Sequence, residues 1–237
     1  MTRTSSEIRH FTQLEHIWWG ARTAVGQKRY DNKASLFNNY VNAKKGSRIL
    51  EIGCGDGEFT KRIIGFGRKI VATDVTPEVI KRAKGFVKNS DVSFMIDDSE
   101  KISFRDGSFD VVCGVSILHH LDTLKALRES YRVLKKGGEI FFTEPNLLNP
   151  IIYLGLHIGL LRYIMEYSPD ETALVRWEIE KMLKNIGFRY VEVRNYDFLY
   201  PHTPKFAMDT IIRLSNILEK TPLIKEISGS LLIYGIK

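Results

Sequence analysis

The residues best suited to chemistry begin with a glycine-rich turn, Glu51-Ile52-Gly53-Cys54-Gly55-Asp56-Gly57, between an expected strand and an expected helix. Glycines let the backbone bend sharply and leave space for a ligand to lie against amide groups at a helix N-terminus. A dinucleotide-binding turn has the spacing G-x-G-x-x-G, whereas here the third glycine comes one residue early. The turn therefore predicts a nucleotide-like cofactor that lacks a pyrophosphate.

Carboxylates follow at the ends of the next two expected strands. Asp74 ends the second strand, where it can accept hydrogen bonds from both ribose hydroxyls of an adenosine. In Asp97-Asp98-Ser99-Glu100, after the third strand, one carboxylate can accept the exocyclic amine of an adenine. A polar loop that caps a strand is the alternative for each acid taken singly. Acids at successive strand ends together favour an adenosine site.

Candidate catalytic groups follow the fourth and fifth expected strands. His119 and His120 titrate in the range that general acid–base catalysis needs, and His120 is our preferred base. A histidine that opens a helix and bonds only a backbone group is the alternative. Glu144 stands at the end of strand five, where it faces the binding crevice or caps the next helix. We expect no metal site, because C-x-x-C pairs and H-E-x-x-H are absent.

The elements that must position these residues alternate as βαβ units from residue 48 onward, which is typical of a parallel sheet. We expect strands at 48–53, 69–74, 92–96, 109–115, 139–145, 188–196 and 230–237. We expect helices at 58–64, 77–88, 122–134 and 168–185, an apolar helical insertion at 147–167 and a helical segment near 205–219. The fold class is therefore α/β, a doubly wound, mostly parallel sheet with one antiparallel strand near its edge.

Composition favours a single domain, 1–237, because 237 residues with 43% hydrophobic content can bury one large core. Eight basic residues face three acidic ones before Gly46, but no Lys/Arg-rich run with interleaved aromatics occurs there, which argues against nucleic acid as a partner. No apolar run reaches the roughly 20 residues of a spanning helix. The N-terminus lacks the apolar core of a secretion signal, and the chain has two cysteines, so we expect the reducing cytoplasm.

Five segments in order, ILEIGCGDGEFT, ATDVTPEVIKRA, DDSEKISF, SFDVVCGVSILHHL and VLKKGGEIFFTEPN, resemble the successive motifs of class I S-adenosylmethionine-dependent methyltransferases. Within that superfamily the chain is similar to the small-molecule group that includes quinone-biosynthesis enzymes. The resemblance implies a Rossmann-like sheet with strand order 3-2-1-4-5-7-6 and strand 7 antiparallel. It also implies an N-terminal helical cap (1–46), a cofactor-binding core (47–146), a lid insertion (147–167) and a C-terminal part of the sheet (168–237).

The resemblance further implies S-adenosylmethionine as cofactor and S-adenosylhomocysteine as product. Glu51 and the glycine turn would hold the methionine portion, Asp74 the ribose, and Asp98 with Ser99 the adenine edge. The full set of expected cofactor-binding residues is Glu51, Gly53, Cys54, Gly55, Gly57, Asp74, Val75, Asp97, Asp98, Ser99, Val115, Ser116, Trp19 and Arg22.

The N-terminal stretch Glu15-His16-Ile17-Trp18-Trp19-Gly20-Ala21-Arg22 resembles an H-x-W-W-x-x-R lead-in of some members, whose helices fold over the cofactor. Trp18, Trp19 and Arg22 would then close the site, with Arg22, Lys28 or Arg29 facing a carboxylate. Packing of the two tryptophans onto the domain is the alternative.

The acceptor is expected to be a small, apolar or aromatic molecule that is methylated at oxygen or carbon. The tetrapeptide N-P-P-Y or D-P-P-Y, which the resemblance associates with amino methylation of bases or proteins, is absent after strand four. We expect Tyr153, His157 and Tyr163 of the insertion to line the acceptor pocket, although core packing or a homodimer contact would explain the insertion as well. The loop after strand six would add Tyr196, Phe198, Tyr200 and His202.

Two other functions remain open at this point. An NAD(P)-dependent oxidoreductase shares the glycine turn and the acid after strand two, although the glycine spacing argues against it. A non-catalytic module that binds the cofactor or a partner would keep the same motifs.

Overall fold

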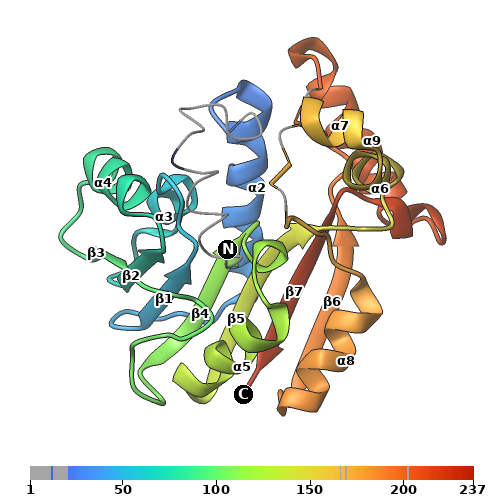
Figure 1. Ribbon diagram of the computed structural model, residues 1–237. Helices are drawn as coiled ribbons and strands as arrows, with labels where there is room; N and C mark the ends of the chain where they lie inside the picture. The colour runs from blue at the N-terminus through green and yellow to red at the C-terminus, as the bar shows by residue number, and fades with distance from the viewer. Residues whose placement is uncertain (1–11, 13–20, 166, 169, 202) are drawn as a thin grey trace.

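The computed structural model describes residues 12, 21–165, 167, 168, 170–201 and 203–237. Its centre is a seven-stranded sheet with the order β3-β2-β1-β4-β5-β7-β6 (Figure 1). Neighbouring strands are parallel except β7, which is antiparallel to both β5 and β6. The predicted strand order and the antiparallel strand are therefore confirmed.

The strands and helices have the following bounds. The strands are β1 (Arg48–Ile52), β2 (Lys69–Asp74), β3 (Val92–Ile96), β4 (Phe109–Val115), β5 (Leu134–Pro145), β6 (Tyr190–Tyr196) and β7 (Ser230–Ile236). The α-helices are α2 (Ala24–Tyr40), α3 (Glu58–Ile63), α4 (Pro77–Phe86), α5 (Thr123–Val133), α6 (Pro150–His157), α7 (Gly159–Ile164), α8 (Arg176–Ile186) and α9 (Met208–Leu218). Short 3₁₀ helices are η1 (Leu118–His120), η2 (Lys205–Ala207) and η3 (Ile224–Ile227).

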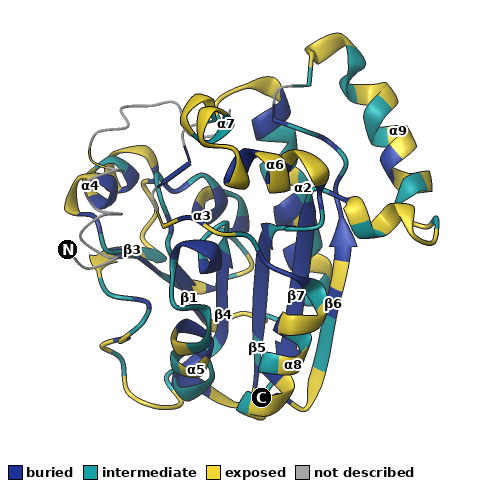
Figure 2. Cartoon of the chain, turned by 45° about the vertical axis from the view of Figure 1, so that its right-hand side comes forward, coloured by how far each residue is buried: buried dark blue, intermediate teal, exposed yellow. Residues whose placement is uncertain are grey.

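Helices cover both faces of the sheet because successive side chains of each strand point to opposite faces. In β1, Ile49 packs with buried residues of α2, α3 and α4, whereas Leu50 packs with buried residues of α5 and α8. Figure 2 shows the buried strands between these helices, whose outer sides are exposed. The N-terminal helix α2 is anchored by Phe37, whose ring meets Phe59 and Phe141 edge-on with centroids 5.7 and 5.4 Å away. This contact packs α2 against one face of the sheet.

Two predicted boundaries are wrong. Strand five begins at Leu134 rather than at residue 139, because Phe109 of β4 pairs with Leu134 before the register shifts to Val111 and Glu139. Helix α8 begins at Arg176 rather than at residue 168. Ser168 and Glu171 do form a reciprocal turn, but the chain beyond them is extended, since Leu174 forms a bridge with Asn146. Long-range pairing thus overrides the local helix signal.

The insertion consists of two short helices, α6 and α7, separated at Ile158 by an extended backbone (φ −103°, ψ 112°). Only α6 has buried residues, which are Ile152, Gly155 and Leu156. Among the described residues, no helix has both the length and the apolar composition needed to cross a bilayer.

Candidate active site

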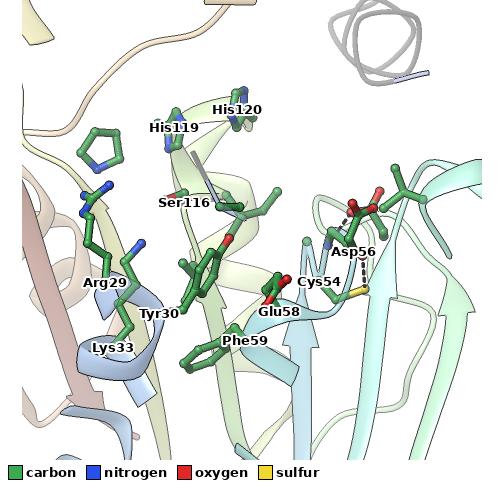
Figure 3. A pocket seen from close by; sticks show the side chains of 18 of the residues that line it. Arg29, Tyr30, Lys33, Cys54, Asp56, Glu58, Phe59, Ser116, His119 and His120 are labelled. Atoms are coloured by element: carbon green, nitrogen blue, oxygen red, sulfur yellow. Dashed lines mark hydrogen bonds between the residues drawn. The ribbon is translucent and has the colours of Figure 1, made fainter. Parts of the chain in front are cut away.

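One elongated cavity lies at the carboxyl ends of the central strands (Figure 3). One part of it, the glycine end, is lined by Glu51, Gly53, Gly55, Asp74 and Asp98. The other part, the histidine end, is lined by His119, His120, Glu171 and Tyr200. The expected site residues that line the cavity are Arg22, Glu51, Gly53, Cys54, Gly55, Asp74, Val75, Asp98, Ser99, Val115, Ser116, His119 and His120.

The glycine turn needs glycine for two different reasons. Gly53, Gly55 and Gly57 have φ values of 62°, 53° and 86°, a region that side chains rarely adopt. A Cβ on Gly53 would lie 2.3 Å from the side chain of Ile117, so no other residue fits between the turn and the end of β4. A Cβ on Gly55 would meet nothing within 4 Å, so this glycine leaves open space beside the cavity.

Asp74 fixes the turn from the neighbouring strand. Its carboxylate accepts hydrogen bonds from the amides of Gly55 (3.2 Å) and Thr76 (2.9 Å). Burial raises the pKa of Asp74, and these two backbone bonds oppose that rise. Each carboxylate oxygen keeps a further lone pair, so Asp74 can bind a ligand hydroxyl while it holds Gly55.

Glu51 is the buried acid of the glycine end. Its side chain is 1% exposed, and its Oε2 has no hydrogen-bond partner among the described residues. Burial raises the pKa of Glu51 to about 8, with a further contribution from the charge of Asp74. A buried acceptor without a partner is costly, so this oxygen is suited to a cationic or hydrogen-donating group of a ligand.

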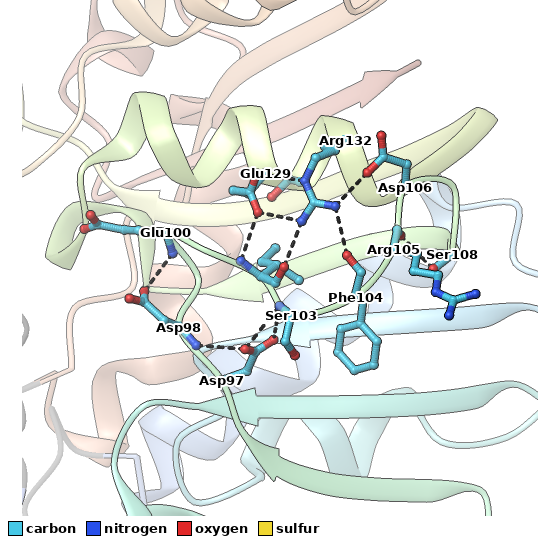
Figure 4. Close-up of polar contacts among 12 residues, drawn as sticks. Asp97, Asp98, Glu100, Ser103, Phe104, Arg105, Asp106, Ser108, Glu129 and Arg132 are labelled. Carbon is cyan, nitrogen blue, oxygen red and sulfur yellow. Dashed lines mark hydrogen bonds and ion pairs between the residues drawn. The ribbon is translucent and has the colours of Figure 1, made fainter.

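The loop after β3 is clamped from α5 (Figure 4). The Arg132 guanidinium donates to the carbonyls of Ile102 (2.8 Å) and Phe104 (2.9 Å), and it also pairs with Glu129. Asp97 faces this loop, where its carboxylate accepts the amide of Ser103. These contacts hold Asp98 and Ser99 at the cavity wall.

At the histidine end, His119 lies between two glutamates. Its Nδ1 donates to Glu144 Oε2 (2.6 Å), and its Nε2 lies 3.6 Å from Glu171 Oε1. Burial opposes protonation of His119, but the two carboxylates outweigh burial and raise its pKa to about 9. The bond to His119 also keeps the pKa of Glu171 below its ordinary value, against the effect of burial. His119 is therefore an imidazolium at neutral pH.

Glu144 also shapes the backbone of η1. Its Oε1 accepts hydrogen bonds from the amides of Ile117 (3.0 Å) and Leu118 (2.9 Å), so the hydrogen bonds of this oxygen are made within the protein. Glu144 is 1% exposed and does not line the cavity. Its geometry is that of a residue that positions His119 and His120.

Ligand atoms of His119, His120 and Glu171 all lie within 4.8 Å of one another, a spacing that one cation could bridge. The bonds of His119 to two carboxylates instead favour a bound proton at this place. The absence of a metal stays a prediction.

Helix α2 brings cations to the cavity. Arg29 pairs with Asp197 (2.9 Å) of the loop after β6, and Lys33, 6% exposed, has no hydrogen bond or ion pair to any described residue. Burial and the charge of Arg29 lower the pKa of Lys33 to about 7. Its amino group is available to an anionic group of a ligand. Arg22 is 61% exposed in its side chain and lies 3.8 Å from Asp56.

Several expected residues lie elsewhere. Gly57 forms the N-cap of α3 with a left-handed backbone and lies outside the cavity. Asp97 and Glu144 also lie outside the cavity. The three insertion residues expected at the acceptor pocket, Tyr153, His157 and Tyr163, do not line this cavity, and Tyr153 stacks on His157 at an exposed face. The insertion lines the cavity with Ile152 and Tyr167 instead. Of the loop after β6, Tyr200 lines the cavity, whereas Tyr196 and Phe198 do not. Trp18, Trp19 and His202 lie outside the described residues.

Tyr30, Lys33 and Glu171 also line the cavity, although no sequence motif singled them out. Arg29 and Lys33 stand four positions apart, on one face of a helix, and this spacing was the available signal. No sequence signal indicated a site role for Glu171, because the motif around it predicted the start of a helix.

Replacing Glu144 with glutamine should lower the pKa of His119 from about 9 towards the ordinary value of 6.5, because the closer carboxylate is neutralised. Glu171→Gln should lower it less, since that carboxylate is 3.6 Å away. The folded-state pKa lies above the unfolded one, so this charge pair stabilises the fold below pH 6.5 and the stabilisation is lost as the pH rises through 9. An NMR titration of the His119 ring measures the shift, and an unchanged pKa in Glu144→Gln would contradict the assignment.

Comparison with known proteins agrees with this geometry. Residues 50–142 match a family model described as a methyltransferase domain. A ubiquinone biosynthesis O-methyltransferase from Xanthomonas oryzae pv. oryzae is 30% identical over 148 residues, 60% of this chain and 61% of that relative, so the match spans about three fifths of its length. Its counterpart from Nitrosococcus oceani is 26% identical over 244 aligned positions, covering 98% of this chain and 95% of the relative.

Among solved structures, a SAM-dependent methyltransferase from Thermotoga maritima has the same fold, with a TM-score of 0.68 at 19% identity over 98% of this chain and 99% of that one. The family match and the shared fold agree with the resemblance expected from the motifs: residues 50–142 match a methyltransferase domain, and the sheet has the fold of a SAM-dependent methyltransferase.

Proposed function

We propose that this protein binds S-adenosylmethionine at the glycine end of the cavity and transfers its methyl group to a small apolar or aromatic acceptor, at oxygen or carbon. The observation that carries the proposal is a single cavity that joins Asp74 and the glycine turn to the histidine pair. The relatives described as ubiquinone biosynthesis O-methyltransferases support an acceptor of this kind. The free thiols of Cys54 and Cys113 are compatible with the predicted reducing compartment.

The glycine end fits this cofactor. Glu51 offers a buried acceptor without a partner for the ammonium of the methionine portion, and Gly55 leaves space where a Cβ would intrude on a ligand. Asp74 would accept the ribose hydroxyls, with Val75 beside it, and Asp98 with Ser99 would bind the adenine edge. Val115 and Ser116 would line the methionine and methyl end, and Arg22 would cover it.

When bound, the sulfonium supplies an already activated methyl group, so the protein's main task is to hold the acceptor in line and exclude water. Such positioning contributes about 7–11 kcal/mol to lowering a barrier. Ile117 and Leu118 are fixed by Glu144, which sets the place of both histidines. The imidazolium of His119 is placed to stabilise negative charge on an acceptor oxygen. His120 would accept the proton of a hydroxyl acceptor.

Asp74→Asn should weaken binding of S-adenosylhomocysteine about 10- to 150-fold, because charge-assisted hydrogen bonds are each worth about 1.5–3 kcal/mol. Calorimetry measures this, with Asp91→Asn as the matched control, since Asp91 is a half-buried acid that pairs with Lys69 outside the cavity. Wild-type protein should bind NAD far more weakly than S-adenosylhomocysteine. Tight binding of NAD alone would instead support the oxidoreductase alternative.

Binding of S-adenosylhomocysteine should expel a proton from Glu51 at neutral pH. The free protein has a Glu51 pKa of about 8, so the carboxyl is protonated below that value, whereas the ligand ammonium favours the carboxylate. Affinity should therefore rise with pH by up to about tenfold per unit until the pH passes the pKa. Calorimetry in buffers of different ionisation enthalpy counts the protons. Glu51→Gln should abolish the release, and an equal release in this variant would rule out Glu51 as the source.

His120→Ala should lower turnover by about 10²–10⁴, the usual worth of a general base, while the affinity for S-adenosylhomocysteine changes less than about twofold. Turnover is followed as transfer of radioactive methyl from S-adenosylmethionine into a small-molecule extract that the wild-type protein labels. His157→Ala removes a histidine outside the cavity and serves as the control. A fully active His120→Ala variant would show that His120 is not the base. If the wild type labels no extract, that result would count against methyl transfer.

A further inference from the structure

The end of the molecule that carries the insertion exposes an unusual amount of apolar side chain. Of the nineteen large apolar side chains exposed in the described ranges, thirteen belong to residues 151–164 and 206–227. We call these thirteen the apolar surface. Figure 2 shows both segments at the upper end of the molecule, with much of α7 and α9 exposed. Monomeric proteins rarely gather such groups on their surface without a partner.

The first segment is helical, and its apolar side chains are exposed although the backbone is ordered in α6 and α7. Leu160, Tyr163 and Ile164 of α7 are 69%, 83% and 63% exposed, and α7 has no buried residue. The only Lys, Arg, Asp or Glu between 151 and 164 is Arg162, which donates to the carbonyls of Leu156 and Ser168 and so fixes the helix pair. The segment is therefore held with its apolar side chains facing outward.

The second segment combines apolar side chains with positive charge. Phe206, Ile217 and Leu223 are 90%, 63% and 84% exposed. Its acids Glu219 and Glu226 are turned inward, where they accept hydrogen bonds from the Asp197 amide and the Asn195 side chain. The exposed charged residues of residues 205–227 are Lys205, Arg213, Lys220 and Lys225 against the single acid Asp209. The surface is thus apolar with an excess of cations.

The first segment borders the cavity directly, and the second is connected to it by a neighbouring loop. Ile152 of α6 and Tyr167, just after α7, line its wall, and so does the loop 199–201 that leads towards the second segment. A partner that covers the apolar surface would therefore lie against the side of the cavity formed by the insertion.

We propose that the apolar surface docks this protein on an anionic lipid bilayer, with α7 and the α9–η3 segment lying in the headgroup region. Apolar groups flanked by Lys and Arg are the features by which helices bind such an interface. A second copy of the chain fits less well, because a two-fold contact through this surface would gather the four exposed cations of both copies in one interface that has a single exposed acid from each copy. This inference goes beyond methyl transfer and does not depend on it.

The experiment is co-sedimentation of the full-length protein with vesicles of phosphatidylcholine, alone or mixed two to one with phosphatidylglycerol. The wild type should bind the mixed vesicles and bind pure phosphatidylcholine about tenfold or more weakly. Leu160→Asp should reduce binding about tenfold or more, because it removes one apolar side chain from the interface. Arg213→Glu should reduce binding at least about fivefold, and added salt should weaken it further.

Phe66→Asp is the matched control, since Phe66 is 72% exposed and lies before β2, at the opposite end of the strands from the cavity. It should leave vesicle binding unchanged. The proposal is overturned if the wild type binds neither vesicle, if Phe66→Asp and Leu160→Asp weaken binding equally, or if Leu160→Asp only converts a dimer into monomers.

Calorimetry with S-adenosylhomocysteine on the same samples checks that the variants are folded. It also separates the two proposals. Vesicle binding without S-adenosylhomocysteine binding would refute only methyl transfer, and the reverse would refute only docking.

Discussion

The carboxylate of Glu144 sits at the buried end of β5 and bonds two backbone amides of η1 and the ring of His119. Because a buried carboxylate is costly unless its oxygens are bonded, these contacts leave η1 one favourable position. That position sets both histidines at the cavity and places Ile117 against Gly53 of the glycine turn. One buried acid thus links the two ends of the cavity, although it does not touch the cavity itself.

At the glycine end of the cavity, Asp74 likewise fixes a loop by accepting hydrogen bonds from its backbone amides. It bonds the amides of Gly55 and Thr76 before any ligand arrives, so the turn is already in a binding conformation. Both acids follow one principle, in which a strand end supplies a carboxylate that satisfies the amides of the adjacent loop. The difference lies in exposure: Asp74 lines the cavity and keeps lone pairs for a ligand, whereas Glu144 is enclosed. Such prearranged contacts reduce the ordering that ligand binding must cost.

The insertion contributes side chains both to the cavity wall and to the apolar surface. The insertion supplies two side chains to the cavity wall and seven large apolar side chains to the exterior, so under the docking proposal it would lie between the cavity and a bilayer. An apolar acceptor dissolved in lipid would then meet the cavity near its source. The two proposals, docking and methyl transfer, are independent of each other because they rest on different residues.

The glycine turn and the acids at successive strand ends were predictable from the sequence, because each depends on local spacing within one βαβ unit. The order of the strands was predicted only through the resemblance of five motifs to a known family. The helix predicted from residue 168 was wrong because bridging of Leu174 to Asn146 outweighs a local start signal. Only the tertiary structure placed Lys33 and Glu171 at the cavity and made His119 an imidazolium, since these properties arise from contacts between residues far apart in the chain. The outward face of the insertion was likewise decided by packing, because an apolar helical pattern is the same whether its partner is a core or a membrane.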